Sequence, residues 1–115
     1  MKETTRQSKV AKQIQKDISE IILKNGNSWV PGKLVTVTVV KITPDLGLAK
    51  VYVSIFPSTQ AQDAVNLLDN HHNFIRNELG KKLRHQLKKV PELNFYLDDS
   101  LDYIDNIDNL LKSND

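Results

Sequence analysis

The sequence contains no cysteine and has no long hydrophobic run. The missing cysteines exclude disulfides, thiolate chemistry and zinc sites with thiolate ligands. The most apolar stretch, residues 34–42, is interrupted by threonines and a lysine and is far too short to cross a bilayer. The first residues are polar and lead into no apolar segment, so no signal peptide is expected. We therefore expect a soluble, cytoplasmic protein without membrane contact.

Motifs for catalysis and for metal binding are also missing. There is no P-loop, no glycine-rich dinucleotide turn and no nucleophile elbow. His71 and His72 are adjacent, so their side chains would diverge by about 100° on a helix, and no third histidine or cysteine stands at ligand spacing. We expect no enzyme activity, metal, cofactor or small-molecule substrate. A ribonuclease is the enzymatic alternative, and it would need acids converging in the basic region around Glu78.

The length and composition indicate one folded domain. The chain has 115 residues, of which 39% are hydrophobic and 26% are charged, as in ordinary soluble proteins. No linker, repeat or low-complexity segment divides the sequence. We predict a single domain over residues 1–115, with an ordered core over residues 6–111.

The net charge of +2 hides an uneven distribution of charged residues. Residues 1–24 carry six lysines and arginines against three acids, and residues 76–92 carry six against two. The sign reverses from Asp98 onward, where several aspartates face Lys112. Two basic segments of this kind favour a polyanionic partner and predict binding that weakens as the salt concentration rises.

The first part of the sequence predicts a helix followed by a hairpin. Apolar residues at helical spacing indicate a helix over residues 8–23, with a stop signal at Asn25-Gly26-Asn27. Residues 34–42 and 48–56 alternate as strands, and the short turn between them makes an antiparallel hairpin. In the first strand we expect one face to hold Val35, Val37 and Val39.

The later elements are two helices, a strand and a last short helix. Ser58 or Thr59 can cap the first helix, and a second spans residues 74–88, with Gly80 indicating a close backbone approach. Residues 93–97 alternate as a third strand, and Ser100 can cap the last helix. Each helix has a single apolar stripe, so the helices must cover one face of a three-stranded sheet. The predicted class is α+β.

Three blocks of the sequence carry a family resemblance. The first block is Arg6 with Lys9-Val10-Ala11-Lys12-Gln13-Ile14 and Ile18-Ser19-Glu20-Ile21-Ile22. The second is Asp45-Leu46 followed by Ala49-Lys50-Val51-Tyr52-Val53-Ser54. The third runs from Phe74-Ile75-Arg76-Asn77-Glu78-Leu79-Gly80-Lys81-Lys82-Leu83-Arg84 to Val90-Pro91-Glu92-Leu93-Asn94-Phe95 and Asp98-Asp99-Ser100. Together these blocks resemble the ribosome-binding factor A family over most of residues 6–111.

The resemblance implies a single KH-like domain of the bacterial type (type II), with the order α-β-β-α-kink-α-β plus a short C-terminal helix. It also implies an assembly factor that binds 16S rRNA in the immature 30S subunit. Such a factor assists late maturation, including processing of the 5′-end region of 16S rRNA, especially in the cold. The family's interhelical Ala-x-Gly kink is replaced here by His71, His72 and Asn73. Asn73 tolerates a left-handed conformation, so we expect the kink there.

The basic residues near the third block are the candidate RNA-binding residues. The primary set consists of Arg76, Lys81, Lys82, Arg84, Lys88 and Lys89, and the secondary set on the first helix consists of Lys9, Lys12 and Lys16. The simpler alternative is a solvated helix face, which is what most charge runs are. A second alternative is a protein-interaction module that docks an acidic partner. Off the ribosome we expect a monomer.

Overall fold

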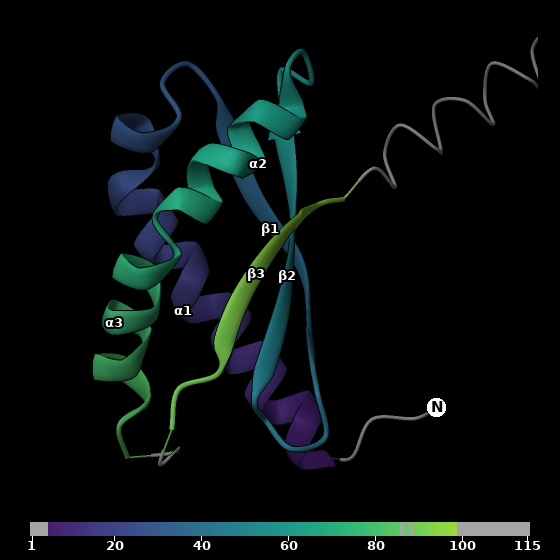
Figure 1. The fold of residues 1–115 in the computed structure, drawn as a ribbon, viewed down its shortest axis with the longest axis vertical. Helices are drawn as coiled ribbons and strands as arrows, with labels where there is room; N and C mark the ends of the chain where they lie inside the picture. Colours follow the sequence, from purple (N-terminus) through teal and green to yellow (C-terminus); the bar gives the residue numbers. More distant parts are fainter. Residues whose placement is uncertain (1–4, 86, 88, 99–115) are drawn as a thin grey trace, which may run out of the picture.

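Three helices cover one face of a three-stranded sheet in the computed structural model, which describes residues 5–85, 87 and 89–98 (Figure 1). The elements follow the predicted order. They are α1 (Thr5–Trp29), β1 (Leu34–Ile42), β2 (Leu48–Phe56), α2 (Ala61–Asn70), α3 (His72–Leu83) and β3 (Glu92–Leu97). The predicted α+β class is therefore confirmed, whereas the helix expected from Ser100 lies outside the described residues.

The strands of the sheet lie in the order β1-β2-β3. β1 and β2 form the predicted antiparallel hairpin, and β3 lies parallel to β2 with Tyr96 opposite Tyr52. A parallel neighbour requires a crossover connection, which α2 and α3 provide. The side chains of β2 alternate as predicted, and its buried face consists of Ala49, Val51, Val53 and Ile55.

β1 contains a bulge at Thr38, which breaks the simple alternation of its side chains. Val39 lies on the open face and is 41% exposed, whereas Val40 is turned inward and is 6% exposed. The prediction that Val39 shares a face with Val37 is therefore wrong. One extra residue in a strand moves every later side chain to the opposite face of the sheet, and the sequence pattern did not reveal it.

Hydrogen bonds hold the bulge in place. The Gln15 side-chain amide of α1 donates to the carbonyl oxygens of Val37 at 3.3 Å and Thr38 at 3.2 Å. The Thr38 hydroxyl shares its one hydrogen between the Asp98 carboxylate and the Tyr52 carbonyl oxygen, which lies 3.2 Å away. A bulge leaves backbone groups outside the strand ladder, and these side chains provide partners for them.

α1 is longer than predicted and continues through Asn25-Gly26-Asn27 to Trp29. The side-chain amide of Asn25 donates to the Ile21 carbonyl oxygen at 2.8 Å, so Asn25 supports the helix instead of ending it. The chain leaves the helix after Val30, whose amide still donates to the Gly26 carbonyl oxygen at 2.7 Å. Gly32 then takes a positive φ of 76°, which glycine adopts without a steric penalty.

The start of α2 and the end of α3 also differ from the prediction. The residue before α2 is Gln60, in a left-handed conformation and without a side-chain cap, so the capping role given to Ser58 or Thr59 is wrong. Thr59 is engaged elsewhere, because the Lys33 ammonium donates to its hydroxyl at 3.2 Å. α3 ends at Leu83 and does not reach Lys88, which lies outside the described residues.

The early end of α3 lets the chain turn back toward β3. Val90 then packs on Gly80, where an added Cβ would lie 3.0 Å from the Val90 Cγ2 atom. Gly80 therefore has a close neighbour, but the contact is made by the Val90 side chain and not by the backbone approach that we predicted.

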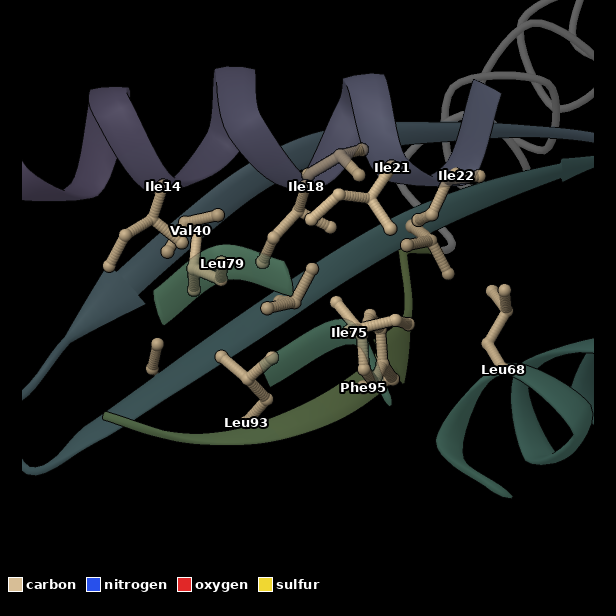
Figure 2. Close-up of a cluster of buried hydrophobic side chains, with 14 of the residues drawn as sticks. Ile14, Ile18, Ile21, Ile22, Val40, Leu68, Ile75, Leu79, Leu93 and Phe95 are labelled. Atoms are coloured by element: carbon tan, nitrogen blue, oxygen red, sulfur yellow. The ribbon is translucent and has the colours of Figure 1, made fainter. Parts of the chain in front are cut away.

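The core lies between the helices and the covered face of the sheet (Figure 2). Ile14 and Ile18 of α1 and Ile75 and Leu79 of α3 are each 0% exposed. Burying one such side chain contributes about 1.5–3 kcal/mol, so this face of α3 belongs to the core and only its remaining surface can meet a partner. Among the described residues, no helix is long and apolar enough to span a membrane.

Candidate nucleic-acid interface

Arg76 links α3 to the segment that leads into β3. Its guanidinium donates to the Pro91 carbonyl oxygen at 3.1 Å and to the Val90 carbonyl oxygen at 2.8 Å. Its side chain is 27% exposed, and it also lies 3.6 Å from the Glu92 carboxylate. The structure thus gives this candidate RNA-binding residue a role within the fold, because its Nε and Nη2 atoms already have protein acceptors.

Lys81 and Lys82 are adjacent but have different surroundings. Lys82 joins α3 to α1 through an ion pair with Glu20 at 3.0 Å, and its side chain is 33% exposed. The hydrogen bond between these two groups, together with their charges, lowers the pKa of Glu20 and raises the pKa of Lys82. Lys81 is 77% exposed and pairs with Glu78 at 2.8 Å within the same helix. A surface pair of this kind is weak, so Lys81 is the more available cation.

Arg84 and Lys89 are exposed and lie beside an open hollow of about 730 Å³. Its walls come from three parts of the chain: the start of α1, the turn between β1 and β2, and the segment after α3. We call it the basic hollow. Its described lining residues are Arg6, Asp45, Leu46, Gly47, Arg84, His85, Leu87 and Lys89.

The basic hollow contains one acid, Asp45, among its described lining residues. The Thr43 hydroxyl donates to the Asp45 carboxylate at 2.7 Å, and the Gly47 amide donates to it at 2.9 Å. These hydrogen bonds, helped by the charge of Lys89, lower the pKa of Asp45. The carboxylate therefore stabilises the turn. Arg6, Arg84 and Lys89 leave the described lining with a net positive charge. Such a concave basic site suits a phosphate group.

The lysines of the secondary set are all exposed on α1. Lys9, Lys12 and Lys16 follow one another at steps of three and four, so they share one side of the helix. Lys12 lies in a shallow groove between α1 and β1, together with Lys41. This stripe extends the positive surface from the start of α1 along the side of the molecule that borders β1.

The break between α2 and α3 falls at His71, with φ −101° and ψ 14°. Asn73 is helical and lies in the first turn of α3, so the expected left-handed kink at Asn73 is wrong. The ring nitrogens Nδ1 of His71 and His72 lie 2.9 Å and 2.6 Å from the carbonyl oxygens of Leu67 and Asp69. Hydrogen bonds from the imidazoles cap the last turn of α2, so no left-handed residue is needed.

The kink is also supported from α1. The Trp29 ring stacks on the His71 ring with centroids 4.6 Å apart, and it meets the Phe74 ring edge-on at 5.5 Å. His71 is thereby held between a helix end and an aromatic ring. Trp29 also packs against the hydrophobic core and is only partly exposed, so it closes this end of the core.

Arg6 and the turn at residues 45–47 were absent from the candidate set, although they line the basic hollow. Arg6 stands more than seventy residues before Arg84, so only the packed fold brings the two together. The one signal in the sequence was that Arg6 and Asp45 belong to the blocks that carry the family resemblance. The described residues contain no group of three side chains able to hold a metal ion.

Comparisons with known proteins agree on one family. The sequence profile of the family described as Ribosome-binding factor A matches residues 6–111. A ribosome-binding factor A from Christiangramia forsetii is 42% identical over 113 residues, covering 97% of this chain and 86% of that relative. The crystal structure of ribosome-binding factor A from Thermus thermophilus has a TM-score of 0.67 and 20% identity, covering 79% of this chain and 94% of that one.

A homology model of ribosome-binding factor A from Thermus thermophilus has also been fitted into the cryo-EM map of its complex with the 30S subunit. Its coordinates give a TM-score of 0.61 at 21% identity. They cover 77% of this chain and 91% of that one. At these identities the two Thermus structures support the KH-like fold, and the family follows from the sequence matches. This chain belongs to the ribosome-binding factor A family.

Proposed function

We propose that this protein is a cytoplasmic assembly factor that binds 16S rRNA in the immature 30S subunit. In this proposal it is a monomer off the ribosome, it has no catalytic activity, and it assists late maturation, including processing of the 16S rRNA 5′-end region. Family membership supports the ribosomal target, as does the Thermus thermophilus relative fitted into a map of its 30S complex. The observation that carries the RNA contact is the basic hollow, where Arg6, Arg84 and Lys89 converge.

The candidate cations, together with Arg6, divide into three groups under this proposal. Arg84, Lys89 and Arg6 contact phosphates directly, and Lys81 with the α1 lysines provides the surrounding positive field. Arg76 and Lys82 hold α3 against its neighbours. Lys88 belongs to the proposed RNA-binding set but lies outside the described residues. A reversal of Lys82 is a poor probe, because it would place a glutamate against Glu20.

The sharpest test is a charge reversal at Arg84 with a matched control. Arg84→Glu should weaken binding to purified 30S subunits by roughly tenfold or more at low salt, because a phosphate contact is lost and a repulsion is added. Lys24→Glu carries the same change of charge at an exposed position about 27 Å from Arg6 along α1, and it should bind nearly as well as the parent.

Affinities should be measured over a range of salt concentrations. The slope of log K against log salt should become shallower by about 1 for Arg84→Glu and stay unchanged for Lys24→Glu. Co-sedimentation should find the parent protein with free 30S subunits and not with 70S ribosomes. Equal effects of the two substitutions, equal binding to both particles, or binding that survives ribonuclease treatment would each contradict the proposal.

The maturation step needs its own readout in cells. Replacement of the parent by Arg84→Glu should increase the fraction of 16S rRNA that keeps an unprocessed 5′ end, most strongly in the cold. Primer extension on 16S rRNA measures that fraction, with Lys24→Glu as the control strain. If both strains processed the 5′ end like the parent while Arg84→Glu no longer bound the subunit, the role in processing would be wrong.

A further inference from the structure

The second face of the sheet, opposite the helices, is uncovered within the described part of the chain (Figure 1). The strand register places its outward side chains in rows that run across β1, β2 and β3. One row holds Val39, Tyr52 and Tyr96, and the next row, nearer the hairpin turn, holds Lys41, Lys50 and Asn94. An aromatic row therefore lies directly beside a basic row on an open surface.

The two tyrosines form a stacked pair. Their ring centroids lie 5.4 Å apart with an angle of 28° between the planes, and the Lys41 ammonium lies 5.5 Å from the Tyr52 centroid. Lys41, Tyr52 and Tyr96 thus make a ladder of cation, ring and ring, which we call the tyrosine ladder. Tyr96, the last member of the ladder, is 40% exposed.

The charges around the tyrosine ladder are favourable for a polyanion. Lys41 and Lys50 are both exposed and occupy opposite positions on β1 and β2. Among the described acids that border this face, Asp98 accepts a hydrogen bond from Thr38, and Glu92 lies 3.6 Å from the guanidinium of Arg76. Lysines beside exposed rings are complementary to a strand that carries both phosphates and bases.

The tyrosine ladder also continues the basic hollow. Lys41 and Lys50 stand at the hairpin end of their strands, and the turn beyond them supplies Asp45 and Gly47 to the hollow. Gly47 is fixed to the third strand, because its carbonyl oxygen accepts the Glu92 amide at 2.9 Å. A strand of RNA leaving the hollow can therefore pass around this turn onto the open face of the sheet.

We propose that the tyrosine ladder is a second RNA-contact site, which stacks unpaired bases of a single-stranded segment next to the phosphates held in the basic hollow. The inference rests on the proposed RNA-binding function, because the hollow brings the RNA to this face. Stacking tolerates any base, since every base has a π-face, so the site selects single-stranded RNA and not a particular sequence. Asn94, Ser54 and Thr36 offer hydrogen-bonding groups to base edges on the same face.

The test compares two labelled probes of equal length by fluorescence anisotropy. One is an oligouridylate of about 12 nucleotides, and the other has the same backbone with abasic residues in place of the uridines. The double variant Tyr52→Leu with Tyr96→Leu should lose roughly 5- to 150-fold in affinity for the oligouridylate, and its affinity for the abasic probe should stay within about twofold. The matched control is Phe56→Leu, an exposed aromatic residue at the far end of the same face.

Further variants distinguish the loss of the aromatic rings from the loss of the hydroxyl groups or of the fold. Tyr52→Phe with Tyr96→Phe should bind like the parent, because the rings remain, and Tyr96→Thr is a milder substitution if the double leucine variant does not fold. An equal loss for both probes, no loss for either, or a Tyr96-dependent ribosomal protein contact that survives ribonuclease would overturn the ladder as an RNA site.

Arg84→Glu separates the two proposals, because it should weaken both probes alike. If Arg84→Glu had no effect while the tyrosine variants lost the oligouridylate, the basic hollow would be rejected as the phosphate site, and only base stacking on the tyrosine ladder would be supported. The reverse result would keep the hollow and reject the ladder.

Discussion

Replacing Arg76 should destabilise the fold and leave the RNA-binding surface intact. Arg76→Ala removes the two hydrogen bonds to the Val90 and Pro91 carbonyl oxygens. A hydrogen bond to a charged group is worth about 1.5–3 kcal/mol when fully buried, and the side chain here is 27% exposed. We expect a loss of about 2 kcal/mol in the free energy of unfolding, which lowers the melting temperature of a chain of this length by roughly 8 °C.

Arg76→Lys makes this prediction specific. A lysine keeps the positive charge but lacks the planar fork that reaches two carbonyl oxygens at once, so it should recover less than half of the lost stability. Urea unfolding followed by circular dichroism measures the free energy, and RNA affinity should be measured at low temperature, where every variant is folded. Suppose Arg76→Ala were as stable as the parent but bound RNA tenfold more weakly. Arg76 would then act as a surface cation, and its hydrogen bonds to Val90 and Pro91 would contribute little to stability.

Three further predictions concern stability and can be checked by urea unfolding. Gly32→Ala should lower the free energy of unfolding by about 1 kcal/mol, because Gly32 has a φ of 76°. No atom lies within 4 Å of an added Cβ, so the loss would come from the backbone conformation and not from a clash. Gly32→Asn should lose less, and equal losses for the two variants would argue against a left-handed backbone. Gln15→Ala should cost about 1 kcal/mol, because the bulge carbonyls of β1 lose their side-chain donor; an unchanged midpoint would mean that water replaces it. Lys82 lowers the pKa of Glu20, so the ion pair stabilises the fold at pH values above the ordinary glutamate pKa. The parent should therefore have a higher free energy of unfolding than Glu20→Gln at neutral pH, and this difference should disappear as the pH falls through the lowered pKa of Glu20. A constant difference from about pH 7 to about pH 3 would contradict this prediction.

The order and type of the described elements could be predicted because apolar periodicity and turn chemistry agree along the chain. β2 alternates without interruption, so its buried face followed directly from the sequence. β1 has the same composition of valines and threonines, yet its register changes at Thr38. The bulge depends on Gln15, a residue of α1 whose position relative to β1 is set by the packed fold.

Helix ends were the least predictable feature, since each depends on contacts made elsewhere. Asn25 and Gly26 are ordinary helix-ending residues, but α1 continues past them to Trp29, whose ring stacks on the ring of His71 from another part of the chain. Thr59 has the spacing of a capping residue, but its hydroxyl oxygen accepts a hydrogen bond from the Lys33 ammonium. In both cases the local signal was present and a tertiary contact overrode it.

The candidate interface shows the same limit. Charge density drew attention to the region around Arg84 and Lys89, and both residues line the basic hollow. The sequence did not distinguish these cations from Arg76 and Lys82, because ion pairs and carbonyl contacts are made between segments far apart in the chain. For the same reason the sequence did not place Arg6 in the hollow.

The bulge in β1 has a consequence for the protein's behaviour at high concentration. β1 is an edge strand with exposed Leu34 and Val39, and a regular edge of this kind can pair with the edge of another molecule and start aggregation. The irregular step at Thr38 interrupts that edge near its middle, and Gln15 already occupies two of the carbonyl oxygens that an incoming strand would need. The contact between Gln15 and the bulge should therefore also make pairing of this edge with a neighbouring copy less favourable.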